Sequence, residues 1–180
     1  MRLTDITLVE GNHFVAMEYY GLILNRTYLI LLTNTHLIGI VANGLVSIKG
    51  PSGSLAEMFT TKLALAIDGD LDNPFSYLNE KYIRRVNKLN LLNDDLIQSH
   101  RANFRVELVD FPSVRYDSTK KWGMGYYPHD GKVYVEVGGK VREFIILGNQ
   151  SGQAVSDWIQ EKTMTANKAN SSDAKRRAAD

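Results

Sequence analysis

The chain has 180 residues, carries 21 Lys and Arg against 20 Asp and Glu, and contains no cysteine. A net charge of +1 is unlike the strongly basic balance of a dedicated nucleic-acid binder, so we expect no nucleic-acid partner. Without cysteine the chain has no disulfide, thiolate metal site or cysteine nucleophile, and this composition fits a cytoplasmic location.

The N-terminus lacks a basic region followed by an apolar one, so we expect no signal peptide. Residues 27–47 contain no Asp, Glu, Lys or Arg, which raises the question of a membrane span. Turn-forming residues interrupt this stretch at 33–35 and again at Asn43–Gly44. We therefore expect strands here and no transmembrane segment.

The first part of the chain predicts a β-meander, because short aromatic and aliphatic runs alternate with turn residues. The expected strands are Phe14–Leu24, Tyr28–Leu32, Leu37–Val41 and Leu45–Ile48. Asn25–Arg26 would form a tight connection, 33–35 a turn, and Asn43–Gly44 a hairpin turn. Gly and Pro at 50–53 would end the sheet.

A helical block is expected at about 54–100. Ser54 and Glu57 form a capping-box pattern, and the first helix would bury Leu55, Phe59, Leu63 and Ile67. A second helix would start with Asn73 as its N-cap and Pro74 in its first turn. Its expected inner face is Phe75, Leu78, Tyr82, Val86 and Leu89. A third helix would span Leu91–Ser99 and bury Leu92, Leu96 and Ile97.

A second β region follows. Phe104, Val106 and Leu108 alternate with polar residues, which is typical of a strand. Lys120–Tyr127 is predicted as the next strand and Pro128–Gly131 as a turn. The hairpin Lys132–Leu147, which turns at Gly138–Gly139, is predicted from strict alternation and a two-glycine turn.

The last predicted element is an amphipathic helix that Ser151 caps. Its expected inner face is Ala154, Val155, Trp158, Ile159 and Met164. Residues 167–180 are polar and lack large apolar side chains, so we expect a mobile or weakly helical tail. Residues 1–166 would then form a single α+β domain.

Two stretches resemble a known family. The run Glu143–Leu147 followed by Ala154, Val155 and Trp158 resembles the closing strand and capping helix of bacterial pleckstrin-homology-like (PH-like) domains, and Thr27–Thr33 with Leu37–Gly39 resembles their opening hairpin. The resemblance implies a fold class of antiparallel β-sheet, bent into a barrel, with the helical block inserted mid-chain and a C-terminal helix. Phosphoinositide binding is not implied, because Arg26 stands alone where lipid-binding members carry a basic cluster.

Three carboxylates at alternate positions, Asp68, Asp70 and Asp72, could converge on one calcium ion. The pattern then departs from a calcium-binding EF-hand loop, because Asn73 replaces the glycine at position six and Asn79 replaces the bidentate glutamate at position twelve. We favour a helix stop followed by an acidic first turn, and we expect no metal and no cofactor.

The strongest candidate for a binding surface combines aromatic and basic residues. Five of them are candidate binding residues: Lys120, Lys121, Trp122, Tyr126 and Tyr127. Exposed aromatics beside cations favour interfaces. The alternative is that Trp122 and one tyrosine pack into the core under the lysine stems.

The four histidines show no local metal-ligand spacing, and no nucleophile motif or phosphate-binding loop is present. We therefore expect a non-catalytic binding module with a protein partner, working at an exposed sheet edge or at the groove beside the helical block. One alternative is an enzyme or metal-dependent protein with a site assembled from dispersed residues. Another is a peripheral membrane binder that uses Arg84, Arg85, Lys88 and the tail. The sequence sets no oligomeric state.

Overall fold

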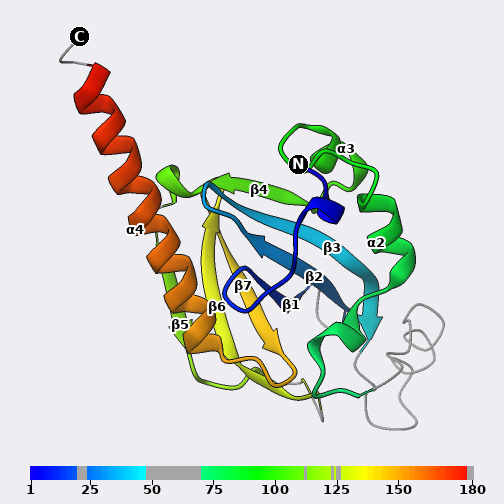
Figure 1. Ribbon diagram of the computed structural model, residues 1–180. Coiled ribbons are helices and arrows are strands. Elements are labelled where there is room, and N and C mark those ends of the chain that lie inside the picture. Colours follow the sequence, from blue (N-terminus) through cyan, green and yellow to red (C-terminus); the bar gives the residue numbers. More distant parts are fainter. Residues whose placement is uncertain (20–23, 48–69, 112, 123, 125–126, 178–180) are drawn as a thin grey trace, which may run out of the picture.

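The structure is a computed structural model that describes residues 1–19, 24–47, 70–111, 113–122, 124 and 127–177 (Figure 1). Within these residues seven strands form one antiparallel sheet. They are β1 (His13–Tyr19), β2 (Leu24–Leu32), β3 (His36–Ser47), β4 (Phe104–Glu107), β5 (Val114–Asp117), β6 (His129–Val137) and β7 (Lys140–Leu147). The α-helices are α2 (Glu80–Val86), α3 (Asp95–Ser99) and α4 (Gly152–Arg177), and the 3-10 helices are η1 (Leu3–Asp5), η2 (Pro74–Tyr77) and η3 (Leu108–Asp110). The α+β class is thereby confirmed.

The strand order is β4-β3-β2-β1-β7-β6-β5, so the sheet consists of two meanders. Strands β1 to β4 form the first, and β5 to β7 form the second. They meet where β1 pairs with β7, with Ala16 opposite Ile146. Among the described strands, β4 and β5 therefore stand at the two ends of the sheet.

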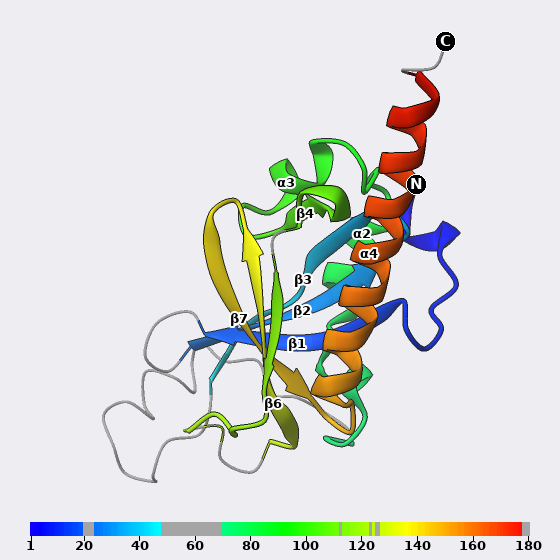
Figure 2. The same ribbon diagram turned by 90° about the vertical axis from the view of Figure 1, so that its left-hand side faces the viewer.

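Each face of the sheet carries its own apolar core. On one face Val15, Met17 and Ile145 pack with residues of η2, α2 and α3. On the other face Phe14, Phe144 and Ile146 pack with α4 and the segment around η3. Both cores extend across β1, β2 and β3, so the apolar runs of β2 and β3 are buried on both faces, as their continuous hydrophobicity predicts. Figures 1 and 2 show α4 on one side of the sheet and α2 and α3 on the other.

The predicted turns at Asn25–Arg26 and Asn43–Gly44 are wrong. The first pair lies within β2 and the second within β3, where Arg26 pairs with Leu45. The pairing of β2 with β3 shifts register between Arg26 and Tyr28. The Asn43 side chain is buried and donates to the Tyr77 carbonyl at 3.0 Å, which fastens η2 to the sheet. Asparagine here serves a tertiary contact that short-range turn chemistry does not reveal.

The first predicted helix, with the Ser54 cap, lies outside the described residues. The Asn73 cap is confirmed, because its side-chain oxygen accepts from the Phe75 N–H at 3.0 Å. The expected continuous helix is wrong: η2 ends at Tyr77, and α2 starts again at Glu80 with Asn79 as its N-cap. The Asn79 N–H donates to the Ala42 carbonyl of β3 at 2.8 Å, and this bond draws the backbone out of the helical path.

The third predicted helix is shorter than expected. It starts at Asp95, and Leu96 is buried as predicted. Leu92 and Ile97, which were expected to point inward, are 39% and 40% exposed. Leu91 is buried in their place and donates its N–H to the Met1 carbonyl at 2.8 Å.

The hairpin at Gly138–Gly139 is confirmed, with positive φ of 58° and 74° at the two glycines and Val137 opposite Lys140. The predicted strand Lys120–Tyr127 is wrong, because none of its described residues is in a strand. The edge strand is β5, which pairs with β6. The turn at 128–131 is also wrong: β6 begins at His129 and passes through an irregularity that Gly131 permits with φ of 62°.

The last helix begins where Ser151 predicts, and the Ser151 hydroxyl accepts from the Ala154 N–H at 3.3 Å. Val155 and Ile159 are fully buried, whereas Met164 is 60% exposed and does not belong to the inner face. Helix α4 continues to Arg177 through the segment expected to be a tail, and its last turns extend beyond the sheet (Figure 1).

Candidate functional site

One part of the sheet surface has no helix packed over it among the described residues. On β7, Ile145 and Leu147 belong to the core that faces η2 and α2, whereas the residues further along the same face of β6 and β7 are polar except for Val141. We name this surface the outer β5–β7 face. It consists of Arg115, Asp117, Lys132, Tyr134, Glu136, Val141 and Glu143. The strict alternation of β6 puts its polar residues on this side and Val133 and Val135 in the opposite core.

Polar contacts connect the outer β5–β7 face to the predicted binding residues. The Glu143 carboxylate accepts from the Lys121 ammonium at 2.7 Å and from the Tyr134 hydroxyl at 3.2 Å. The Arg115 guanidinium lies over the Tyr134 ring, 4.0 Å from its centroid. Tyr134 and Glu143 therefore connect Arg115 to the predicted binding residue Lys121.

A second ion pair fixes the edge of this face. The Lys132 ammonium donates to Asp117 at 2.9 Å, and the Lys132 side chain is only 10% exposed. This hydrogen bond holds the pKa of Asp117 well below its usual range and raises the pKa of Lys132. Both groups stay charged, so β5 is fastened to β6 by an ion pair in addition to its backbone bonds.

His129 positions the loop that carries Lys121 and Trp122. The Lys121 N–H donates to Nε2 of His129 at 3.1 Å, and Nδ1 lies 2.9 Å from the Tyr127 carbonyl. A neutral ring protonated at Nδ1 satisfies both contacts. The loop is thus attached to the start of β6 by one imidazole.

Trp122 follows Lys121 directly and is 93% exposed. The alternative that Trp122 packs into the core is therefore wrong. A tyrosine does take the core position, because Tyr127 is buried and meets Tyr77 edge to face at 6.1 Å between ring centroids. Lys120 is exposed, and Tyr126 lies outside the described residues.

A hollow of about 480 Å³ lies on the outer β5–β7 face. It is lined by Ser113, Val114, Arg115, Tyr134, Glu136 and Val141. Val141 is 68% exposed, so the hollow offers aliphatic and aromatic surface next to charged groups. Such a mixture is typical of protein-binding surfaces.

The predicted calcium ligands do not form a site in the described part of the chain. Asp68 lies outside it, and Asp70 and Asp72 are exposed. The Asp70 carboxylate accepts from the Asp72 N–H at 3.0 Å, which is turn chemistry at the start of η2. No group of three or more His, Asp or Glu side chains with metal-binding geometry occurs among the described residues.

The cations of the membrane alternative lie on α2 and just beyond it. Arg84 and Arg85 are exposed, and Arg84 lies 3.6 Å from Glu80 one turn earlier in the helix. None of the helices in the described ranges combines the length and hydropathy that crossing a lipid bilayer requires.

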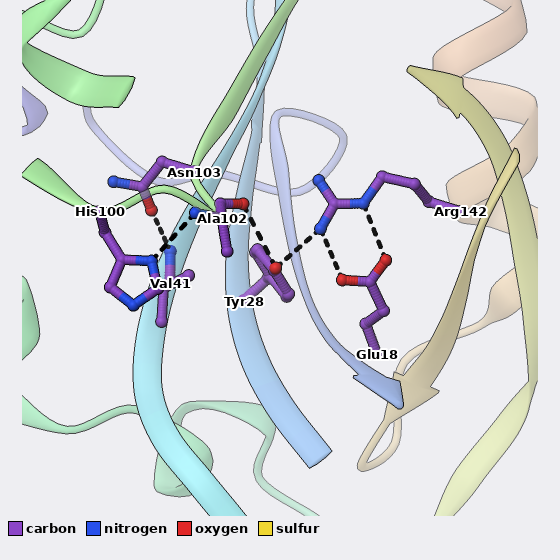
Figure 3. A network of polar contacts seen from close by, with 7 residues as sticks. All are labelled: Glu18, Tyr28, Val41, His100, Ala102, Asn103 and Arg142. Atoms are coloured by element: carbon purple, nitrogen blue, oxygen red, sulfur yellow. Dashed lines mark hydrogen bonds and ion pairs between the residues drawn. The ribbon is translucent and has the colours of Figure 1, made fainter. Parts of the chain in front are cut away.

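A polar network across the three middle strands of the sheet has a structural role (Figure 3). The Arg142 guanidinium donates to Glu18, at 2.8 Å from Nε, and to the Tyr28 hydroxyl at 2.7 Å. It also lies over the Phe104 ring, 4.2 Å from the centroid. Burial raises the pKa of Tyr28 although the Arg142 charge lowers it. The side chains of Arg142 and Glu18 are only 15% and 21% exposed, so this network ties β1, β2 and β7 together from inside.

A larger hollow of about 650 Å³ lies between the N-terminal segment, the β2–β3 turn and α4. Its wall includes Trp158, whose indole lies against Gly11, and Lys162, which donates to the Asn34 side chain at 2.8 Å. None of the predicted binding residues lines it.

Comparison with protein-family models, with curated proteins and with solved structures gives no match. The argument for function therefore rests on the geometry of the outer β5–β7 face and the adjoining loop.

Proposed function

We propose that this chain is a non-catalytic binding module with a protein partner, and that it binds through Trp122 and the outer β5–β7 face. The observation that carries this proposal is the 93% exposure of Trp122 beside Lys120 and Lys121. Tryptophan is usually mostly buried and is enriched among the residues that dominate binding energy.

The surroundings of Trp122 support a protein partner. Tyr134 and Arg115 are residue types that interfaces favour, and each is already held in place, Tyr134 by Glu143 and Arg115 by the Tyr134 ring. Side chains that are ordered before binding lose less conformational entropy when a partner docks. The face therefore has both the composition and the preorganisation that binding requires.

The proposed scaffold is a PH-like bent sheet with a helical insertion between β3 and β4. Two supports are the strand order, in which meanders of four and three strands join through β1 and β7, and the C-terminal helix with a half-buried Trp158. A cytoplasmic location is part of the proposal and rests on the lack of cysteine.

The test is quantitative affinity capture from a lysate with the full chain and two variants. Trp122→Ala removes the proposed anchor, and we expect it to reduce the captured partner at least about tenfold, as hot-spot truncations of about 2 kcal/mol do. Met164→Ala is the matched control, because Met164 is also an exposed apolar residue, 60% exposed, but lies on α4. Equal capture by Trp122→Ala and the wild type, with both variants folded, would refute the proposed surface.

A further inference from the structure

Strand β5 stands at one end of the sheet, and the backbone of Val114–Asp117 makes no hydrogen bond within the described residues except with β6. In an antiparallel pair successive residues direct their N–H and C=O groups to alternate sides. Two of these four residues therefore present both groups outward, which is a template for a further strand.

Among the described residues, no element forms backbone hydrogen bonds with this edge. Helix α4 packs on one face of β5, where the Tyr116 ring lies against Gly152. Figure 2 shows α4 beside β5 rather than across its edge. The other end strand, β4, has a salt bridge from Arg105 to Asp94 at 3.9 Å.

The charged side chains of β5 indicate which charge a strand paired with β5 should carry. Arg115 and Asp117 both lie on the outer face, and Asp117 already forms an ion pair with Lys132. Arg115 has no carboxylate partner in the described residues; its guanidinium lies on the Tyr134 ring. An acidic residue directly opposite Arg115 would form a favourable cross-strand pair.

The hollow indicates which side chain the added strand would carry two residues after the acidic one. Ser113 precedes Arg115 by two residues, and it lines the hollow with Val141 and Tyr134. Side chains two positions apart lie on the same face of a strand. An antiparallel strand with an acidic residue opposite Arg115 would therefore direct the side chain two residues later into the hollow, and an aliphatic group fits there.

We propose that the partner's binding segment is an extended acidic peptide that adds to β5 as an antiparallel strand, with Asp or Glu opposite Arg115 and an aliphatic residue two positions later in the hollow. This inference rests on the proposed function and specifies its ligand. Strand addition obtains affinity from main-chain hydrogen bonds and specificity from alternate side chains, and both are present here.

The test is NMR titration of the isotope-labelled full chain with the peptide Thr-Lys-Thr-Glu-Thr-Leu-Thr and with a control peptide in which Lys replaces Glu. We expect saturable shifts of the β5 amides at millimolar peptide. The peptide with Glu at the fourth position should bind about 2- to 5-fold more tightly than the one with Lys there, the range of one cross-strand charge pair.

A charge exchange separates strand pairing from general attraction. Arg115→Glu should reverse the preference, so that the lysine peptide binds this variant better. Lys88→Glu makes the same charge change at an exposed site between α2 and α3 and should leave the preference as in the wild type. Absence of β5 shifts, or the same preference in Arg115→Glu as in the wild type, would overturn the inference. If Trp122→Ala still abolishes capture of the partner in that case, the proposed function stands and the partner binds the face without adding a strand.

Discussion

The two halves of the sheet differ on the face that carries η2, α2 and α3. Under these helices, β1, β2 and β3 present Val15, Leu31 and Ile40, all fully buried. On β5, β6 and β7 the same face presents Arg115, Tyr134 and Glu143, which pair with one another or with the loop at Lys121. One half is thus stabilised by apolar burial, and the other keeps a polar, preorganised surface available for binding.

The difference follows from the number of covered faces. Strands covered on both faces need apolar side chains at every position, whereas strands covered on one face need them at alternate positions. The helical block between β3 and β4 covers the first half, and the second half lacks such a cover in the described residues. The following predictions test how strongly the two halves differ, from the largest effect to the smallest.

Leu31→Ala should lower the free energy of unfolding by about 3 kcal/mol, because Leu31 is fully buried between the sheet and the helical block. Val141→Ala on the exposed half should change it by less than about 0.5 kcal/mol, since Val141 is 68% exposed. Urea unfolding measures both. Similar losses for the two variants would show that the halves contribute equally to stability.

Two ion pairs extend the comparison from apolar to charged groups. Arg142→Met leaves the largely buried Glu18 without its partner, and we expect a loss of about 2–3 kcal/mol. Lys121→Met breaks the pair with Glu143, whose two side chains are each 30% exposed, and should cost less than about 1 kcal/mol. Urea unfolding at low and high salt measures both losses. The loss in Lys121→Met should shrink more at high salt, because salt screens the more exposed ion pair.

Gly39→Ala tests the close packing between β3 and β4. A Cβ at Gly39 would lie 1.8 Å from the ring of Phe104, which is its cross-strand neighbour. We expect a loss of about 2 kcal/mol from overpacking. Adding Phe104→Leu should recover part of that loss relative to the sum of the single changes, and a double-mutant cycle measures the recovery. A purely additive cycle would contradict the predicted contact.

The smallest effect is expected from pH. Burial, with the charges of Arg26, Arg101 and Arg85, lowers the pKa of His100. A folded-state pKa below the unfolded value of about 6.5 means that stability is present above that pH and is lost as pH falls through the folded pKa. His100 Nδ1 also accepts from the Ala102 N–H at 3.2 Å, which a protonated ring cannot do.

Stability should therefore fall between pH 7 and pH 5, by less than about 1 kcal/mol for His100 after solvent screening. The His100→Asn variant should lose part of this dependence, while His36, whose pKa burial also lowers, maintains the rest. Thermal unfolding across this pH range measures the difference. Parallel pH profiles for the variant and the wild type would contradict the role of His100.

The sequence determined those elements whose signal is local. Alternation and two glycines identify the β6–β7 hairpin, continuous apolar runs identify the buried parts of β2 and β3, and Ser151 marks the start of α4. These patterns depend on backbone conformation and on which faces are covered, and both are encoded by neighbouring residues.

Local sequence patterns predicted only part of the candidate site. The predicted binding residues include Lys121 and Trp122, but Arg115, Tyr134 and Glu143 lie beside one another only because β5, β6 and β7 pair in register. The alternation of β6 already indicated an exposed Tyr134, although not its neighbours. Trp122 is exposed whereas Tyr127 is buried, because the Tyr127 ring contacts Tyr77. These two tyrosines are 50 residues apart in the sequence, and no local pattern specifies their contact.

Tertiary structure decided the other features that local patterns did not predict, because these features also depend on contacts between residues far apart in the sequence. Asn43 carries a strong turn signal, yet it lies within β3, where its side chain donates to the Tyr77 carbonyl. Asn79 interrupts the predicted helix, and its N–H donates to the Ala42 carbonyl of β3. Likewise β5 stands at an end of the sheet, with no further strand paired to it among the described residues, because of its place in the strand order. Local sequence sets which conformations a segment prefers, while distant partners determine which backbone and side-chain groups are left available for binding.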